Sequence, residues 1–257
     1  MEMPNMLIDV HCHLNEPEFE HDLNDVISRA LKAGVIKIID CGLGPSKIIR
    51  SLEISGKYKS IVYTSAGLEP YNLNERDFNN VVELIEKFSD MIVAIGEVGL
   101  DYYYVRELNS RLVQKERFLK FIGLAKELDL PLVIHSRSAG KYALSIIMES
   151  NAERVLFHAF DGSAKYAVRG AEHGFYFSIP PSVTRSRQKQ LLVEKVPLEN
   201  LMTESDSPVL GPDPRERNEP CNVTISARKI AEIKGVEYDE VVKATYKNAL
   251  NLFTRVK

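Results

Sequence analysis

The chain has 257 residues, of which 44% are hydrophobic and 27% are charged, and its formal net charge is −3. This composition is that of an ordinary globular protein, and the charge argues against a surface that wraps nucleic acid throughout. Three separated cysteines without a C-x-x-C pair, and a first segment with an acid and a proline, favour a cytoplasmic protein without disulfides, signal peptide or membrane span.

Short apolar runs alternate with longer amphipathic stretches along the chain. The predicted strands cover residues 7–10, 35–40, 60–66, 91–96, 130–134, 154–157, 175–179 and 200–205. The predicted helices cover about 22–33, 45–55, 75–88, 110–128, 139–150, 165–173, 184–194, 222–234 and 238–253. Apolar strands separated by helices are typical of a parallel sheet covered on its outside. The pattern predicts a single (β/α)₈ TIM-type barrel domain over residues 1–257.

Two histidines end the first apolar run, LIDVHCHL. Side chains two positions apart on a strand point to the same face, so His11 and His13 are placed to chelate a metal. An isolated H-x-H is more often just the polar end of a strand. In a barrel of this kind, however, the active site lies at the C-terminal ends of the strands. Four other runs lead there into ligand-type residues, namely Glu97, His135, His158 and Asp206.

This set predicts a metal centre. Imidazoles and carboxylates without thiolates favour zinc, manganese, cobalt or iron, and magnesium fits the carboxylates. Six ligands exceed the needs of one tetrahedral ion, so we expect two divalent ions about 3.5–4 Å apart. Glu97 is the expected bridge between them. One ion would be held by His11, His13 and Asp206, and the other by His135 and His158.

The same residues stand in motifs that resemble the TatD-type metal-dependent deoxyribonucleases, a branch of the amidohydrolase-like barrels. The motifs run from Leu7 to Phe253 in the order DVHCHL, GEVGLDYY, LPLVIHSR, HAFDG, ESDSPVL, RNEPCNV and KNALNLF. The resemblance implies the same six metal ligands, and it implies DNA as the substrate.

Four positions depart from the family pattern, of which Ser205, in place of the usual threonine before Asp206, is a minor change. Glu69 stands where the family usually has a histidine after the third strand, and Ala159 and Asp161 replace the Cys and Ser of the usual H-C-F-S-G motif. We expect Glu69 to change phosphate affinity or substrate preference. Asp161 either adds a carboxylate beside the substrate or caps the next helix.

Further residues are assigned roles in this site. A water between the ions is expected to lose its proton near neutral pH and attack a phosphodiester. Asp206 would accept the proton, or serve only as a ligand. Arg137 would hold a substrate phosphate or form a surface ion pair, and Glu204 would orient a metal ligand or pair with Arg137. Tyr102 and Tyr103 would stack on a nucleobase or pack the loop on the barrel rim.

The leading hypothesis is a divalent-metal phosphodiesterase that digests DNA from a single-stranded or frayed end. The net charge fits a pocket that engages a few nucleotides. The alternative is hydrolysis of an ester or amide, such as an aminoacyl ester on tRNA, because the same ions polarise a carbonyl. A barrel that only binds is the third interpretation, and the intact ligand set argues against it. No protein partner is implied.

Overall fold

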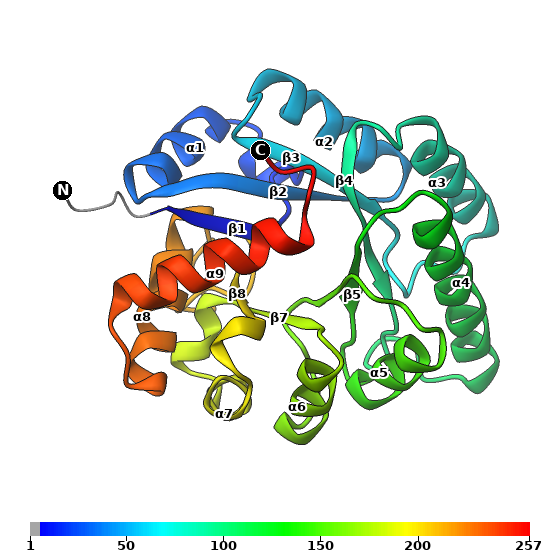
Figure 1. Ribbon diagram of the computed structural model, residues 1–257. Helices are drawn as coiled ribbons and strands as arrows, with labels where there is room; N and C mark the ends of the chain where they lie inside the picture. Colours follow the sequence, from blue (N-terminus) through cyan, green and yellow to red (C-terminus); the bar gives the residue numbers. More distant parts are fainter. Residues whose placement is uncertain (1–5) are drawn as a thin grey trace.

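The computed structural model describes residues 6–257, in which eight strands and nine α-helices alternate (Figure 1). The strands are β1 (Leu7–Cys12), β2 (Val35–Leu43), β3 (Val62–Gly67), β4 (Ile92–Gly99), β5 (Leu132–His135), β6 (Val155–Phe157), β7 (Tyr176–Ile179) and β8 (Leu201–Thr203). Each strand is parallel to the next, in the order β1 to β8. The predicted (β/α)₈ barrel is confirmed.

The helices surround the strands and cover the outside of the barrel (Figure 1). They are α1 (Leu23–Lys32), α2 (Pro45–Lys57), α3 (Glu75–Lys87), α4 (Leu108–Glu127), α5 (Gly140–Glu149), α6 (Ala164–Glu172), α7 (Arg187–Lys195), α8 (Val223–Lys234) and α9 (Tyr238–Leu252). None of these helices combines the length and apolar character that crossing a membrane requires. The first five residues, on which the expectation about a signal peptide rests, lie outside the described part of the chain.

The barrel interior has its own small apolar core. Strand side chains such as Val10, Val133 and Leu156 pack there against Leu252 and Phe253 at the end of α9. A second, larger cluster fills the space between the strands and the surrounding helices. Because the end of α9 contributes to the inner core, the opposite, C-terminal ends of the strands are left to form the open mouth of the barrel.

The seam between β8 and β1 is closed by main-chain bonds just beyond the strands. The N–H of Asp206 donates to the carbonyl of His11 at 2.9 Å, and the N–H of His13 donates to the carbonyl of Ser207 at 2.8 Å. Three of these four residues, His11, His13 and Asp206, are predicted from the sequence as metal ligands. The bonds that close the barrel therefore also fix the relative positions of His11, His13 and Asp206.

Two β-bulges lie where ligand-type residues leave the strands. Between the pairs formed by Asp9 and Cys12 with β2, residues 9–12 of β1 contain one residue more than the matching segment of β2. In the same way, residues 96–98 of β4 contain one residue more than the matching segment of β5. A bulge adds one residue to a strand and changes which side chains point to each face. The bulged segments contain His11 and Glu97, and both side chains point into the barrel mouth.

Several predicted boundaries differ from the structure by a few residues, and two of these differences have a clear local cause. The last predicted strand, 200–205, ends at Thr203, because the N–H of Ser205 donates at 2.8 Å to the carboxylate of Asp9 instead of continuing the ladder. The helix predicted from residue 184 begins at Arg187, since the preceding residues form the 3₁₀ turn Pro181–Thr184 and Ser186 caps α7. Glu204 therefore lies just past the end of β8 and not inside the predicted strand.

Candidate metal centre

The six ligand-type residues predicted from the strand ends meet at the barrel mouth. Glu97 lies among the histidines: its Oε2 is 3.0 Å from Nε2 of His11, 3.8 Å from Nε2 of His13 and 3.4 Å from Nε2 of His158, and its Oε1 is 2.6 Å from Nδ1 of His135. Oδ1 of Asp206 is 3.3 Å from Nε2 of His11 and 3.4 Å from Nε2 of His13. The two oxygens of Glu97 thus face different histidines, as a bridging carboxylate requires.

Several nitrogens of this cluster have no hydrogen-bond partner. Within residues 6–257, both ring nitrogens of the fully buried His11 and Nδ1 of His158 are unsatisfied. Leaving a buried polar atom without a partner costs about 1–3 kcal/mol. Metal coordination would satisfy Nε2 of His11, which faces Glu97 and Asp206. The donor set, imidazole and carboxylate, fits a borderline divalent cation.

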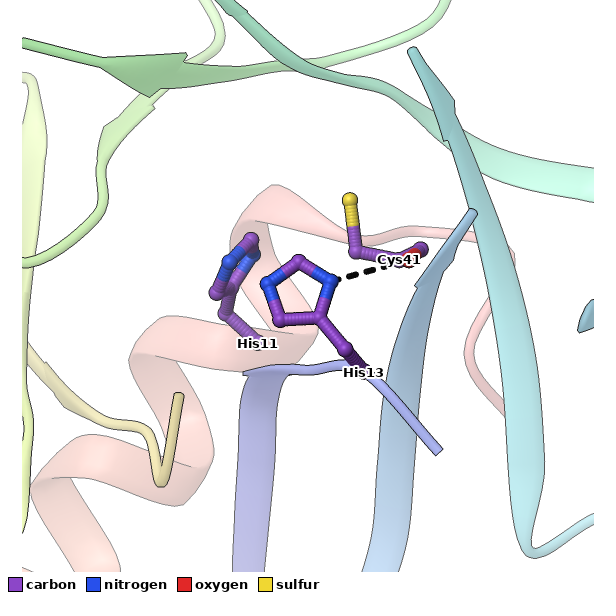
Figure 2. A group of neighbouring side chains, drawn as sticks. All are labelled: His11, His13 and Cys41. Carbon is purple, nitrogen blue, oxygen red and sulfur yellow. Dashed lines mark hydrogen bonds between the residues drawn. The ribbon is translucent and has the colours of Figure 1, made fainter. Parts of the chain in front are cut away.

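Two of the histidines are oriented by hydrogen bonds on their far side. The Nδ1–H of His13 donates to the main-chain carbonyl of Cys41 at 3.1 Å, which Figure 2 shows as a dashed line. The Nε2–H of His135 donates to Asp101 Oδ2 at 3.0 Å. Each bond fixes the tautomer and leaves the other ring nitrogen free to face Glu97, which is the usual arrangement around a metal ligand.

Asp101 was not predicted as a site residue. It is fully buried, and its Oδ1 also accepts the main-chain N–H groups of Tyr103 and Tyr104 at 2.9 and 2.8 Å. The signal was present in GEVGLD, where an acid follows Glu97 by four residues just after the bulged strand.

Cys41 is a second residue that the sequence did not point to. Its sulfur lies close enough to the nitrogens of His11 and His13 to form a group of three potential ligand atoms (Figure 2). The sulfur also donates to the carbonyl of Gly96 at 3.1 Å and accepts the N–H of Glu97 at 2.9 Å. Burial raises the pKa of this thiol to about 12. As a neutral thiol it anchors the main chain of Glu97.

The ionisable side chains of the centre shift the pKa values of their neighbours. Burial lowers the pKa of His135, but the Glu97 and Asp101 carboxylates outweigh it and raise that pKa to about 9. Burial would raise the pKa of Glu97, yet the neighbouring His158 and His135 hold it well below its usual range. Burial and the proximity of His11 lower the pKa of His158 to about 4. The proton on His135 thus offsets part of the carboxylate charge when no cation is bound.

Glu204 is fully buried beside His158 and, within residues 6–257, forms no ion pair with Arg137. Its Oε1 accepts the N–H of Ala159 at 2.8 Å, its Oε2 accepts the hydroxyl of Ser178 at 2.7 Å, and Nδ1 of His158 is 3.8 Å from Oε2. Ala159 has φ +38°, a conformation that non-glycine residues rarely adopt. Of the two roles considered for Glu204, orienting a metal ligand or pairing with Arg137, this position favours the first, because Glu204 holds the main chain next to His158.

The cluster forms the floor of an open cavity of about 670 Å³. Arg137 lines it, and its guanidinium stacks 4.0 Å from the ring centre of Tyr103. Tyr71 and Tyr104 also line the cavity and meet edge to face at 5.1 Å. Tyr102 is instead half-buried against the apolar cluster outside the strands, and Arg111 stacks 4.1 Å from its ring centre. The tyrosines that line the cavity are thus Tyr71 and Tyr104, and Tyr103 supports Arg137.

Asp161 lines the cavity, as do Glu69 and Ala159, two of the other departures from the family pattern. Its Oδ2 accepts the N–H of Ser138 at 2.7 Å, which ties together the loops that follow β5 and β6. The residue before α6 is Ser163, so the alternative in which Asp161 caps that helix is wrong.

Known proteins resemble this chain along almost its whole length. Residues 8–254 match the family described as TatD related DNase. The human protein named Deoxyribonuclease TATDN3 is 39% identical over 262 residues, which cover 98% of this chain and 96% of that protein. The Bacillus subtilis protein named Uncharacterized metal-dependent hydrolase YabD is 36% identical over 257 residues, or 96% and 99% of the two chains.

A solved structure gives the same result for the fold. The crystal structure of YJJV, a TatD homologue from Escherichia coli K12, matches with a TM-score of 0.89 and 26% identity, and the match covers 98% of this chain and 99% of that one. The resemblance found in the motifs is therefore confirmed. The chain belongs to the TatD-related DNase family of metal-dependent hydrolases.

Proposed function

We propose that this hydrolase is a phosphodiesterase that removes nucleotides from single-stranded or frayed ends of DNA with the help of two divalent ions, Mg²⁺, Mn²⁺ or Zn²⁺. The observation that carries the proposal is the position of Glu97 at the floor of an open cavity, where its Oε1 faces His135 and its Oε2 faces His11, His13 and His158. The relatives named deoxyribonucleases support DNA as the substrate.

The ligands divide into two groups around Glu97. His11, His13 and Asp206 would hold one ion and His135 and His158 the other, with Glu97 shared. Bound there, two ions supply an acidified water as nucleophile and stabilise the charge that develops on the phosphoryl oxygens. The near contact between His135 and His158, whose ring nitrogens are 3.3 Å apart, supports grouping these two. His158 also stacks on His11 at 4.1 Å between ring centres, so it lies between the two proposed ion positions.

The remaining roles belong to side chains that line the cavity. Asp206 reaches the cavity, where its Oδ1 lies 3.3 Å from Nε2 of His11 and 3.4 Å from Nε2 of His13. We assign it as the acceptor of the proton that the attacking water loses. Arg137 offers a planar fork of donors for a non-bridging phosphate oxygen. A reducing compartment such as the cytoplasm suits the free thiols Cys12 and Cys41.

The experiment is digestion of single-stranded DNA, labelled in turn at each end, with Mg²⁺, Mn²⁺ or Zn²⁺ and with a chelator. We expect labelled mononucleotides from one end early in the reaction, and no release with chelator. A blunt duplex should be digested more slowly than a frayed one. Absence of release under every metal, from protein shown to be folded, contradicts the proposal. Hydrolysis of an aminoacyl ester by the same preparation would favour the alternative chemistry.

The bridging role of Glu97 has its own test. Glu97→Ala should lose bound metal, measured by elemental analysis, together with activity, because both ion positions share this carboxylate. Glu116→Ala is the matched control, since Glu116 lies on the outer face of α4 with a 68% exposed side chain. If Glu97→Ala keeps the metal content of the unmodified protein, the bridging assignment is wrong.

A further inference from the structure

The charged side chains around the cavity are unevenly distributed. Glu16 follows β1, Lys47 lies in the first turn of α2, and Glu69 follows β3. Arg137 follows β5, and Lys189 lies in α7, which follows β7. Because the strands run in order around a barrel, β1 to β3 lie across the mouth from β5 to β7. One side of the cavity is therefore rich in carboxylates and the other carries two cations.

The carboxylate side forms one compact cluster. Nζ of Lys47 is 2.6 Å from Oε1 of Glu16 and 3.6 Å from Oε1 of Glu69, so a single ammonium is shared by two carboxylates. Glu18 also lines the cavity on this side and adds a further negative charge. The cluster of Glu16, Lys47 and Glu69 thus keeps a net negative charge. In a partly buried position, such a cluster repels a phosphate more strongly than it would in water.

The two cations on the other side keep donors free. The guanidinium of Arg137 is stacked on Tyr103, and Nζ of Lys189 donates to the carbonyl of Ala159 at 3.0 Å. Within residues 6–257, neither cation has a carboxylate at ion-pair distance. Asp161 shares this side, but one of its oxygens is occupied by the N–H of Ser138. Phosphates are therefore best accommodated beside Arg137 and Lys189.

We propose that this division of charge selects strands whose attacked end carries a hydroxyl and not a phosphate. The phosphates that continue along the strand lie on the side of Arg137 and Lys189. The terminal sugar lies against the cluster of Glu16, Lys47 and Glu69, where a carboxylate accepts a hydrogen bond from its free hydroxyl. The inference rests on the proposed nuclease function and defines the strand end that this site accepts.

The test compares two oligodeoxynucleotides of one sequence, ending in a hydroxyl or in a phosphate at the attacked end. We expect the unmodified protein to release the hydroxyl-ended nucleotide at least about tenfold faster. Glu69→Gln should narrow that ratio several-fold, because the remaining Glu16 is neutralised by Lys47. Lys47→Gln should increase the ratio of the two rates, because it removes the positive charge that offsets Glu16 and Glu69. Glu116→Gln, outside the cavity, should leave the ratio as it is, and metal content is measured for each variant.

Equal rates on the two strands, or a ratio that Glu69→Gln leaves unchanged at normal metal content, would overturn the inference while the nuclease function stands. Binding of the same strands, followed by fluorescence anisotropy, is a readout that needs no turnover. If neither strand is hydrolysed but the protein still prefers the hydroxyl end and Glu69→Gln abolishes that preference, the charge selection holds and the proposed nuclease function is wrong.

Discussion

Asp101→Asn should weaken metal binding through His135 without displacing the loop. The oxygen of the new amide would remain where Oδ1 accepts the N–H groups of Tyr103 and Tyr104. The amide NH₂ would then face Nε2 of His135, 3.0 Å away, in place of a carboxylate oxygen. Two donors cannot share that contact, so neutral His135 would move its proton to Nδ1. That is the nitrogen that faces Glu97, and a protonated nitrogen cannot bind a metal.

The magnitude follows from the loss of this one orienting bond. Removing such a partner typically costs 10- to 100-fold in metal affinity, or about 1.4–2.7 kcal/mol. Competition with a chromophoric chelator measures the affinity. In the metal-free protein, the pKa of His135 should fall, because Asp101 is one of the two carboxylates that raise it. An NMR titration of the ring reports this change, which a purely structural role would not produce.

A matched control is Asp129→Asn, which removes a carboxylate whose side chain is 92% exposed and paired with Arg154. This substitution should change neither the metal affinity nor the pKa of His135. If Asp101→Asn binds metal as tightly as the unmodified protein, or leaves the pKa of His135 where it was, then Asp101 does not set the tautomer of His135 and the reasoning fails.

Two further predictions concern protons and packing. Since the pKa of His135 is about 9 in the metal-free protein, metal binding at pH 7 should release protons, and affinity should rise with pH up to about 9; calorimetry in buffers of different ionisation enthalpy measures the release, and none at pH 7 would contradict it. A Cβ added at Gly67 would lie 2.3 Å from the carbonyl oxygen of Glu97, so Gly67→Ala should destabilise the fold by about 1–3 kcal/mol and reduce metal content. Gly56→Ala in α2, where a Cβ meets nothing within 4 Å, is the control and should be neutral or slightly stabilising in denaturant unfolding.

The fold could be predicted because its signal repeats. Each strand is an apolar run and each helix an amphipathic one, so an error of a few residues at one boundary does not change the architecture. The end of β8 shows where this reasoning stops. The residues after Thr203 continue the strand pattern in the sequence. In the structure, however, the N–H of Ser205 donates to the Asp9 carboxylate and the strand ends. A long-range side-chain bond of this kind leaves no periodic trace.

In the site, the ligand residues can be predicted from the sequence, but other residues that shape the site cannot. Ligand-type residues at strand ends are visible in the sequence, because the barrel fold brings all C-terminal strand ends to one mouth. Cys41 and Lys189 are not visible in this way. The thiol acts through the main chain of Glu97, and the lysine enters the cavity from a helix far along the chain. Their roles depend on the position of one atom relative to another, which strand order alone does not fix.

The bulges in β1 and β4 turn His11 and Glu97 toward the barrel mouth. Strict alternation from the inward-facing Val10 would turn His11 out towards the helices. The extra residue between Asp9 and Cys12 corrects this, so that consecutive side chains, Val10 and His11, both face inward, one in the apolar core and one in the polar mouth. In β4 the extra residue is Glu97 itself. A bulge leaves a residue out of the strand ladder, and both bulges coincide with the change from core to metal centre. The H-x-H spacing therefore indicated the correct shared face for His11 and His13, while the bulge determines that this face is the interior.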